Sequence, residues 1–368
     1  MFDAMSMISN KTLKVFIEIL VLAVVAAGCA EKQQVAGNSE LVKYAENFAI
    51  EYHGDYKVLK VKDGNIWKMY ILYHDKRPDL EGIAIKVPVK RLVVMSSTHL
   101  ALLEAINATD CVVGYTYGGK YKVYFSDVAK KLKSGEIIDL GSSKAPDYEK
   151  LIELHPDLVV CVSGYNEEVK NKLEELGIPY IANSEWLEKD PLARAEWVKF
   201  FAALLDKEDE AEKYFSRIEE NVKAIRNTVN STEKVNLLWA TIYRGKVYVP
   251  RGDSYVAKMA EYAGCNYLFN MPGTGSEVIS LEDLLVRGEK ADVMVYSSYR
   301  VKSLKDIEDI DSRLADLKVF REGRIYNITP DYWQLGLLHT DVVIKDLAAI
   351  AHPDLFKGYT PRFFVRLS

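Results

Sequence analysis

Several short apolar runs of this 368-residue chain end in residues that carry aromatic rings or hydroxyl groups. Ligands of open α/β sheets bind outside the carboxyl ends of the strands, so a binding site is expected at these ends. The candidate ligand-binding residues there are Ser97, Thr98, His99, Tyr115, Tyr117, Tyr165, Trp186, Trp239, Tyr243, Arg244, Arg251, Tyr255, Tyr299, Arg300, Tyr332 and Trp333. This mixture gives a large flat ligand faces to stack on and a few donors for its polar groups.

The charged and titratable members of this set suggest different roles. Arg244, Arg251 and Arg300 suit anionic groups of a ligand, because guanidinium groups form strong hydrogen bonds to carboxylates. His99 lies at the start of a predicted helix that follows a strand end, so it is the histidine predicted to face the ligand cleft. Because the chain holds 23 tyrosines, some of these rings are also expected in loops by chance.

Motifs for catalysis or for binding a bare metal ion do not occur in the sequence. A site for a bare zinc or manganese ion would need clustered imidazoles, but the six histidines form no HxH or HxxxH pair. No Gly-x-Ser-x-Gly elbow is present, and the glycine-rich residues 273–276 lack the lysine and spacing of a phosphate loop. The sequence therefore predicts a binding protein with no metal site and no cofactor of its own, and not an enzyme.

Composition excludes further function classes. The net charge is −5, and no basic run or tail occurs, which argues against a nucleic-acid partner. A hydrophobic content of 49% and a charged content of 27% are typical of a soluble globular protein. Cys111, Cys161 and Cys265 show no metal-ligand spacing and are interpreted as buried structural thiols, with a disulfide between two of them left open.

The order of predicted elements gives the fold class. From residue 91 onward, short apolar strands alternate with helical stretches, which predicts parallel sheets covered by helices. Between about residues 191 and 228 no strand-like run occurs. Apolar residues recur there at three- and four-residue steps, which predicts an amphipathic helix broken around residues 206–209. The chain is thus expected to be α/β, with two α/β lobes joined by a long helix.

The predicted boundaries follow from these changes of pattern. Residues 41–90 alternate apolar and polar side chains around a turn at Asp63-Gly64, which predicts a small N-terminal β-element. The predicted first lobe covers residues 91–187, the linking helix 188–232 and the second lobe 233–368. About 340 residues remain after the N-terminal segment, too many for one core and suitable for two lobes.

The N-terminus reads as a lipoprotein signal. Lys11 and Lys14 precede an apolar run of about 13 residues, shorter than the roughly 20 that a membrane span needs. The run ends in small residues directly before Cys29, where a peptidase would cut and a lipid would be attached. Residues 1–28 are therefore predicted to be a signal peptide, and 29–40 a polar tether. The alternatives are an ordinary signal peptide or an N-terminal helix, with Cys29 in place by chance.

Two tracts repeat between the predicted lobes. Glu149 lies early in a short helix before the Asp-led strand 157–160, and Glu282 lies early in a short helix before the Asp-led strand 292–295. Two related lobes or chance explain this about equally well, because acidic residues favour the first turn of any helix.

The chain also resembles a known family. Residues 91–99 (RLVVMSSTH), 148–160 (YEKLIELHPDLVV) and 176–179 (LGIP) look like the first lobe of ABC-transporter solute-binding proteins for iron–siderophore complexes, haem and cobalamin. Residues 255–264 and 280–295 look like that family's second lobe. The resemblance covers about residues 88–352.

The resemblance implies two rigid lobes, one long helix between them and a ligand held in the cleft. It implies that the ligand is a metal chelate, and that Glu149 and Glu282 dock onto an ABC permease, which works with its ATPase. We expect a monomeric, extracytoplasmic lipoprotein, held at the membrane by a lipid on Cys29. The alternatives are a receptor for a bare zinc or manganese ion, an exported α/β enzyme and a structural or adhesive surface protein.

Overall fold

The computed structural model describes residues 42–298 and 300–368. The predicted signal peptide, Cys29, the tether and Tyr299 lie outside the described residues. Within the described part, no helix has both the length and the apolar character needed to cross a membrane.

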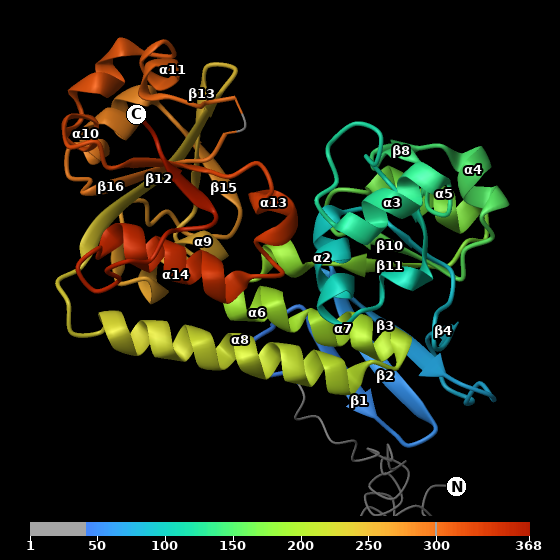
Figure 1. Ribbon diagram of the computed structural model, residues 1–368. Helices are drawn as coiled ribbons and strands as arrows, with labels where there is room; N and C mark the ends of the chain where they lie inside the picture. The colour runs from blue at the N-terminus through green and yellow to red at the C-terminus, as the bar shows by residue number, and fades with distance from the viewer. Residues whose placement is uncertain (1–41, 299) are drawn as a thin grey trace, which may run out of the picture. The chain divides into compact units, whose positions relative to one another are not determined.

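A four-stranded sheet forms the N-terminal part of the described chain (Figure 1). Its strands, in the order β1-β2-β3-β4, are β1 (Phe48–Tyr52), β2 (Tyr56–Asp63), β3 (Ile66–Tyr73) and β4 (Ile83–Lys86). The turn predicted at Asp63-Gly64 joins β2 to β3, and Gly64 has the positive φ of 62° that such a tight turn requires. Leu59, Val61, Tyr70 and Leu72, which lie on one face of the sheet, are part of the main hydrophobic core, so this face packs into the core.

The first lobe is built on an all-parallel sheet with the order β11-β10-β5-β6-β7. Its elements are β5 (Leu92–Val94), α2 (Ser97–Ala105), η1 (Thr109–Cys111), β6 (Val112–Tyr115), α3 (Ser126–Ser134), β7 (Ile138–Asp139), β8 (Gly141–Ser142), β9 (Ala145–Pro146), α4 (Tyr148–Glu153), β10 (Leu158–Val162), α5 (Glu167–Glu175), β11 (Tyr180–Asn183) and η2 (Glu185–Leu187). The central strands β5 and β10 are almost wholly buried, as expected for a parallel sheet covered on both faces.

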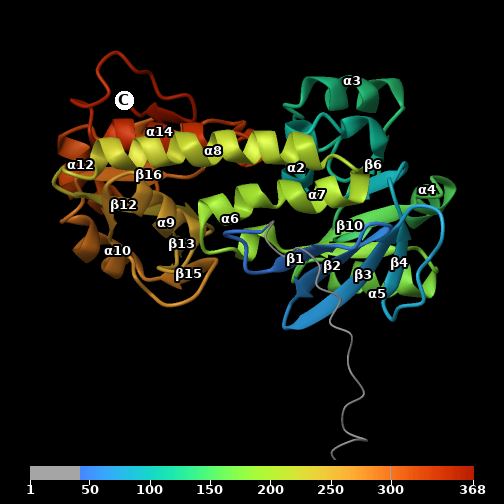
Figure 2. The same ribbon diagram turned by 90° about the horizontal axis from the view of Figure 1, so that it is seen from below.

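Three helices, and not one, connect the lobes: α6 (Pro191–Glu196), α7 (Val198–Leu205) and α8 (Glu208–Val229). Asp206 adopts a left-handed conformation with a φ of 54° and ends α7, which places the break inside the predicted range. The 22 residues of α8 span about 33 Å. Figure 1 shows α8 running beneath the lobes, and Figure 2, seen from below, shows it crossing from one lobe to the other; it contacts α2 of the first lobe and α14 of the second.

The second lobe has a mixed sheet, with the order β15-β13-β12-β16-β17-β18 and β14 paired with β12. Its elements are β12 (Val235–Tyr243), β13 (Lys246–Pro250), α9 (Tyr255–Tyr262), β14 (Cys265–Tyr267), β15 (Ser276–Ile279), α10 (Leu281–Gly288), β16 (Val293–Tyr296), α11 (Leu304–Glu308), η3 (Ser312–Asp316), α12 (Lys318–Arg321), β17 (Ile325–Ile328), α13 (Tyr332–Leu335), α14 (Thr340–Ala351) and β18 (Phe364–Arg366).

The expected parallel pairing is found in the centre of this sheet, and antiparallel strands are added at its edges. Strands β12, β14, β16 and β17 pair in parallel, but β13 pairs antiparallel with both β12 and β15, and β18 pairs antiparallel with β17. Arg244 and Gly245 both have positive φ, 51° and 72°, which is the two-residue turn that folds β13 back onto β12 as a hairpin.

One hydrophobic core runs through the connecting helices into both lobes. It joins Leu100 of the first lobe, Phe201 and Ile218 of the connecting helices, and Trp239 and Ile344 of the second lobe. Two smaller cores fill the outer layers of the second and first lobes. Because protein cores are densely packed, a continuous core between the lobes resists large hinge movements. Cys111, Cys161 and Cys265 are free thiols, and the last two are buried.

Candidate functional site

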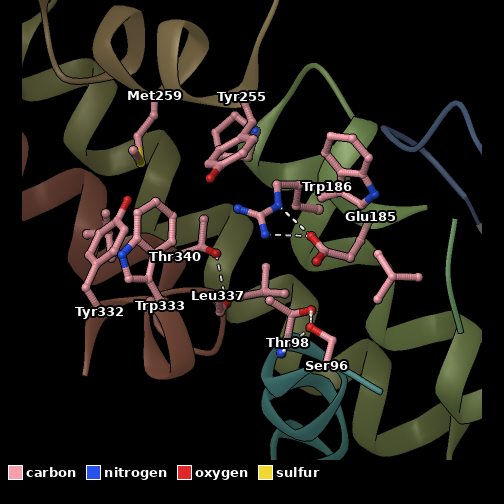
Figure 3. Close-up of a pocket in the computed structure, with 15 residues that line it drawn as sticks. Ser96, Thr98, Glu185, Trp186, Tyr255, Met259, Tyr332, Trp333, Leu337 and Thr340 are labelled. Atoms are coloured by element: carbon pink, nitrogen blue, oxygen red, sulfur yellow. Dashed lines mark hydrogen bonds and ion pairs between the residues drawn. The ribbon is translucent and has the colours of Figure 1, made fainter. Parts of the chain in front are cut away.

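A cavity of about 230 Å³ lies where the two lobes meet the connecting segment. Figure 3 shows its walls: Ser96 and Thr98 come from the first lobe, Glu185 and Trp186 from η2, Tyr255 and Met259 from α9, and Tyr332 and Trp333 from α13. The remaining lining residues are Val162, Pro191, Arg194, Gly336, Leu337, Thr340 and Val343. Five of the sixteen predicted ligand-binding residues line it, namely Thr98, Trp186, Tyr255, Tyr332 and Trp333.

A buried ion pair forms part of the cavity wall. Arg194, on α6, donates from Nε to Glu185 Oε2 at 2.6 Å, and its Nη2 lies at the same distance from that oxygen. The guanidinium carbon lies 3.9 Å from the centre of the Tyr255 ring, which adds a cation–π contact between the connecting segment and the second lobe. Burial disfavours the charged guanidinium, but the attraction of Glu185 outweighs it and the pKa of Arg194 is raised. Arg194 is therefore a fixed cation in the cavity wall.

Trp186 occupies the boundary between the lobes. Its indole Nε1 donates to the carbonyl of Ser163 at 3.1 Å, which fixes the plane of the ring. Side chains at Gly164 of the first lobe and Gly275 of the second would each come within 4 Å of the Trp186 ring. Both glycines have positive φ, 72° and 76°, so it is the backbone conformation of these turns that favours glycine, whereas an added Cβ would only make ordinary contact with the ring.

The hydroxyl groups of the cavity are partly committed to the backbone. Ser96 caps α2 by accepting a hydrogen bond from Thr98 N at 3.2 Å, and the two hydroxyl oxygens lie 2.8 Å apart. Thr340 donates from Oγ1 to the carbonyl of Leu337 at 2.9 Å. The polar groups of the wall are thus held in place before any ligand arrives.

Tyr332 and Trp333 lie side by side on the short helix α13, with ring centres 5.1 Å apart in an edge-to-face arrangement. Tyr332 is buried against Trp239 and Phe364, whereas Trp333 is 40% exposed. Trp333 therefore offers the more accessible aromatic face of this wall.

Three predicted cleft residues belong to the core instead. His99 is 1% exposed and packs near Phe201, and its burial lowers the pKa of the imidazole to about 3, so the ring is neutral. Trp239 is 2% exposed, because β12 continues to Tyr243 and places it in mid-strand and not at a strand end. Tyr115 is buried in the last position of β6.

The other predicted residues of the first lobe do not line the cavity. Ser97 is the first residue of α2, between the two lining hydroxyls. Tyr117 accepts a hydrogen bond from Ser143 Oγ at 3.0 Å, and Tyr165 is an exposed ring beneath the ammonium group of Lys144.

The predicted arginines of the second lobe do not line the cavity either. Arg244 and Arg300 are exposed and lie over the ring of Tyr243, where β12 turns into β13. Arg251 forms an ion pair with Glu277 at 2.5 Å. The cavity arginine is Arg194, which sequence reasoning missed because it lies inside the predicted amphipathic helix, where a polar residue reads as part of a solvated face.

Glu149 and Glu282 occupy matching positions in the two lobes. Each lies in the first turn of a helix, α4 or α10, whose N-cap side chain, Asp147 or Ser280, accepts a backbone hydrogen bond. Both glutamates are exposed, and Glu282 also forms a surface ion pair with Arg313 at 3.3 Å. Such exposed pairs contribute little free energy, so both carboxylates are available to a partner.

Direct hydrogen bonds also join the two lobes. Gln334, next to Trp333, donates from Nε2 to the carbonyl of Lys122 at 2.7 Å and accepts from Tyr124 N at 2.9 Å. Gln334 of the second lobe thus both donates a hydrogen bond to the backbone of a first-lobe loop and accepts one from it. Among the described residues, no group of three or more His, Cys, Asp and Glu side chains is arranged to hold a metal ion.

Comparisons with known proteins agree with this architecture. The periplasmic binding protein family model matches residues 92–332, which span both lobes. A lipoprotein of Methanocaldococcus jannaschii, itself uncharacterized, is 35% identical over 97% of this chain and 96% of its own length. The iron(3+)-hydroxamate-binding protein of Bacillus subtilis is 25% identical over 61% of this chain and 58% of its own.

The fold is also that of a solved structure. A periplasmic heme-binding protein from Pseudomonas aeruginosa superposes with a TM-score of 0.61 at 17% identity, over 76% of this chain and 98% of that one. The family match covers well over half of the chain and includes the cavity walls from Ser96 to Tyr332. The chain therefore belongs to the periplasmic binding protein family, and it is a substrate-binding protein and not an enzyme.

Proposed function

We propose that this chain is the lipid-anchored, extracytoplasmic receptor of an ABC importer, and that it captures an intact metal chelate, either an iron complex or cobalamin, between its lobes. The observation that carries the proposal is the composition of the cavity. Trp186 reaches it from the first lobe, and Tyr255, Tyr332 and Trp333 reach it from the second. Aromatic faces with a few oriented polar groups suit a large organic complex.

The size of the cavity bears on how such a ligand would bind. Its volume of about 230 Å³ is below the roughly 300–1,000 Å³ of pockets that enclose drug-sized ligands. A chelate would therefore enter with one side only, and the rest would lie between the facing loops of the two lobes. The continuous core and the Gln334 contacts favour a small closing movement over a wide hinge.

Delivery needs a partner in the membrane. Glu149 and Glu282 present one exposed carboxylate on each lobe, in equivalent helix turns, and they would pair with basic pockets on two permease subunits. Cys29 would hold the receptor near that permease through its lipid, in keeping with the word lipoprotein in the name of the archaeal relative.

A thermal-shift panel tests the ligand class. The purified protein would be melted with ferric siderophores, haem, cobalamin, and zinc or manganese salts. A ligand at one hundred times its Kd stabilises the folded state by about 2.7 kcal/mol, which is readily measured. We expect stabilisation by at least one chelate and none by the bare ions. Stabilisation by a bare divalent ion alone would favour the small-metal receptor instead.

A further inference from the structure

The charge of the cavity wall is balanced. Among the described residues that line the cavity, Arg194 and Glu185 are the charged ones, and they are paired with each other. The side chain of Glu185 is 4% exposed, and that of Arg194 is 12% exposed. A buried carboxylate this close to the guanidinium leaves no net charge to attract an ion.

This balance differs from what the sequence predicts. Arg244, Arg251 and Arg300 were expected to supply positive charge to the ligand, but Arg251 is paired with Glu277 and the other two are exposed over Tyr243. Lys120 and Lys144 of the first lobe are exposed as well, over tyrosine rings.

Buried and exposed charges act differently on binding. At physiological salt, interactions between exposed charges fade over roughly 8 Å, so these rim cations affect mainly the rate of encounter. The buried pair lies inside the wall, where screening is weak, and determines the cost of placing a charged group there. An anionic group entering the cavity would give up its hydration without gaining a free cation in return.

We infer that the cavity selects a chelate with no net charge, such as a ferric trihydroxamate or cobalamin, over an anionic one, such as a ferric tricatecholate or haem, and that Glu185 sets this preference by neutralising Arg194. The inference rests on the proposed function and names its substrate class. The names of the relatives do not decide the point, because they include both a hydroxamate-binding and a heme-binding protein.

The test compares ligands of different charge, and the first of its two pairs also has the same metal, ferric iron, in both members. Isothermal titration of the purified protein would use ferrichrome, which is uncharged, against ferric enterobactin, which is triply negative, and cyanocobalamin against haem. We expect at least a tenfold preference for the uncharged member of the pair that binds. Measurements at 0.15 M and 0.5 M salt should give the same preference, because the buried pair is screened little.

Two variants assign the preference to Glu185. Glu185→Gln keeps a hydrogen-bond acceptor beside Arg194 but frees its charge, so the preference should fall by at least tenfold or reverse. Glu277→Gln removes the carboxylate of a second arginine–glutamate pair, the one at Arg251, and should leave the preference unchanged. Circular dichroism and melting curves would show that both variants are folded.

Each outcome separates the inference from the function on which it rests. Equal or tighter binding of the anionic chelate by the unmodified protein would overturn the inference, whether or not Glu185→Gln folds, and would leave the receptor function standing. An unchanged preference in folded Glu185→Gln would overturn the role of Glu185. Failure of all four chelates to bind would contradict the proposed function itself, and the inference with it.

Discussion

Replacing Lys170 with Met should destabilise the protein, because it leaves a carboxylate buried without its main partner. Lys170 Nζ lies 2.7 and 2.8 Å from the two oxygens of Asp63, and the side chains are 4% and 6% exposed. Asp63 also accepts a hydrogen bond from Ser163 Oγ, and the carbonyl of Ser163 holds the indole of Trp186. This ion pair therefore ties the N-terminal sheet to a wall of the cavity.

The magnitude follows from what remains around the carboxylate. Breaking a buried ion pair by removing one partner costs about 3–5 kcal/mol. In Lys170→Met, Asp63 keeps the hydrogen bond from Ser163 at 2.8 Å and the weaker partner Lys68 at 3.4 Å. We therefore expect a loss near the lower end, about 3 kcal/mol.

Urea denaturation followed by circular dichroism would measure this loss. The matched control is the double variant Asp63→Asn with Lys170→Met, which leaves no buried charge and should recover most of the stability. A loss of less than about 1 kcal/mol in the single variant, or no recovery in the double variant, would refute the reasoning.

The same pair gives a pH dependence. Burial alone would raise the pKa of Asp63, but the hydrogen bonds from Lys170 and Ser163 outweigh it and the pKa is lowered. A carboxyl whose pKa is lower in the folded state stabilises the protein at neutral pH. That contribution is lost as the pH falls from about 4 through the folded-state value. The double variant should lose less stability over that range than the unmodified protein.

Three further predictions concern the anchor, the lobes and the permease. Cys29→Ser should release the protein from membranes without unfolding it, because the proposed anchor is a lipid on that thiol. Retention after a high-salt wash would exclude a lipid anchor. Gln334→Ala should weaken chelate binding and lower stability by about 1–3 kcal/mol, because two hydrogen bonds between the lobes are lost; unchanged titration and melting curves would contradict this. Replacement of both Glu149 and Glu282 by Lys should abolish uptake by cells but change chelate affinity by less than about threefold. The reason is that exposed charges at the rim act on recognition of the permease. Normal uptake by the double variant would contradict the docking assignment.

Periodicity and strand-end logic predicted the fold class and part of the cavity. Thr98, Trp186 and Tyr255 line the cavity because each follows a strand or opens a helix at the edge where the lobes meet. The same logic failed for Trp239, because the apolar run gave no sign that β12 extends four residues beyond it.

The remaining errors have physical causes of the same kind. His99 was misplaced because α2 buries most of its length, so no polar face marks the side exposed to the cavity. Arg194 was missed because its partner Glu185 lies nine residues earlier, on a separate element. Sequence periodicity relates residues within one helix or strand, and so it gave no sign of this pair. Pairing between elements depends on tertiary structure, which a sequence pattern does not reveal.

The most direct test of chelate capture between the lobes is the position of the metal itself. Crystals of the protein with the chelate that gives the largest thermal shift would be measured at the absorption edge of iron or cobalt. An anomalous peak between the lobes, with the chelate against Trp186, Tyr255 and Trp333, is the result predicted here. A peak elsewhere on the protein, with this cavity empty, would contradict it.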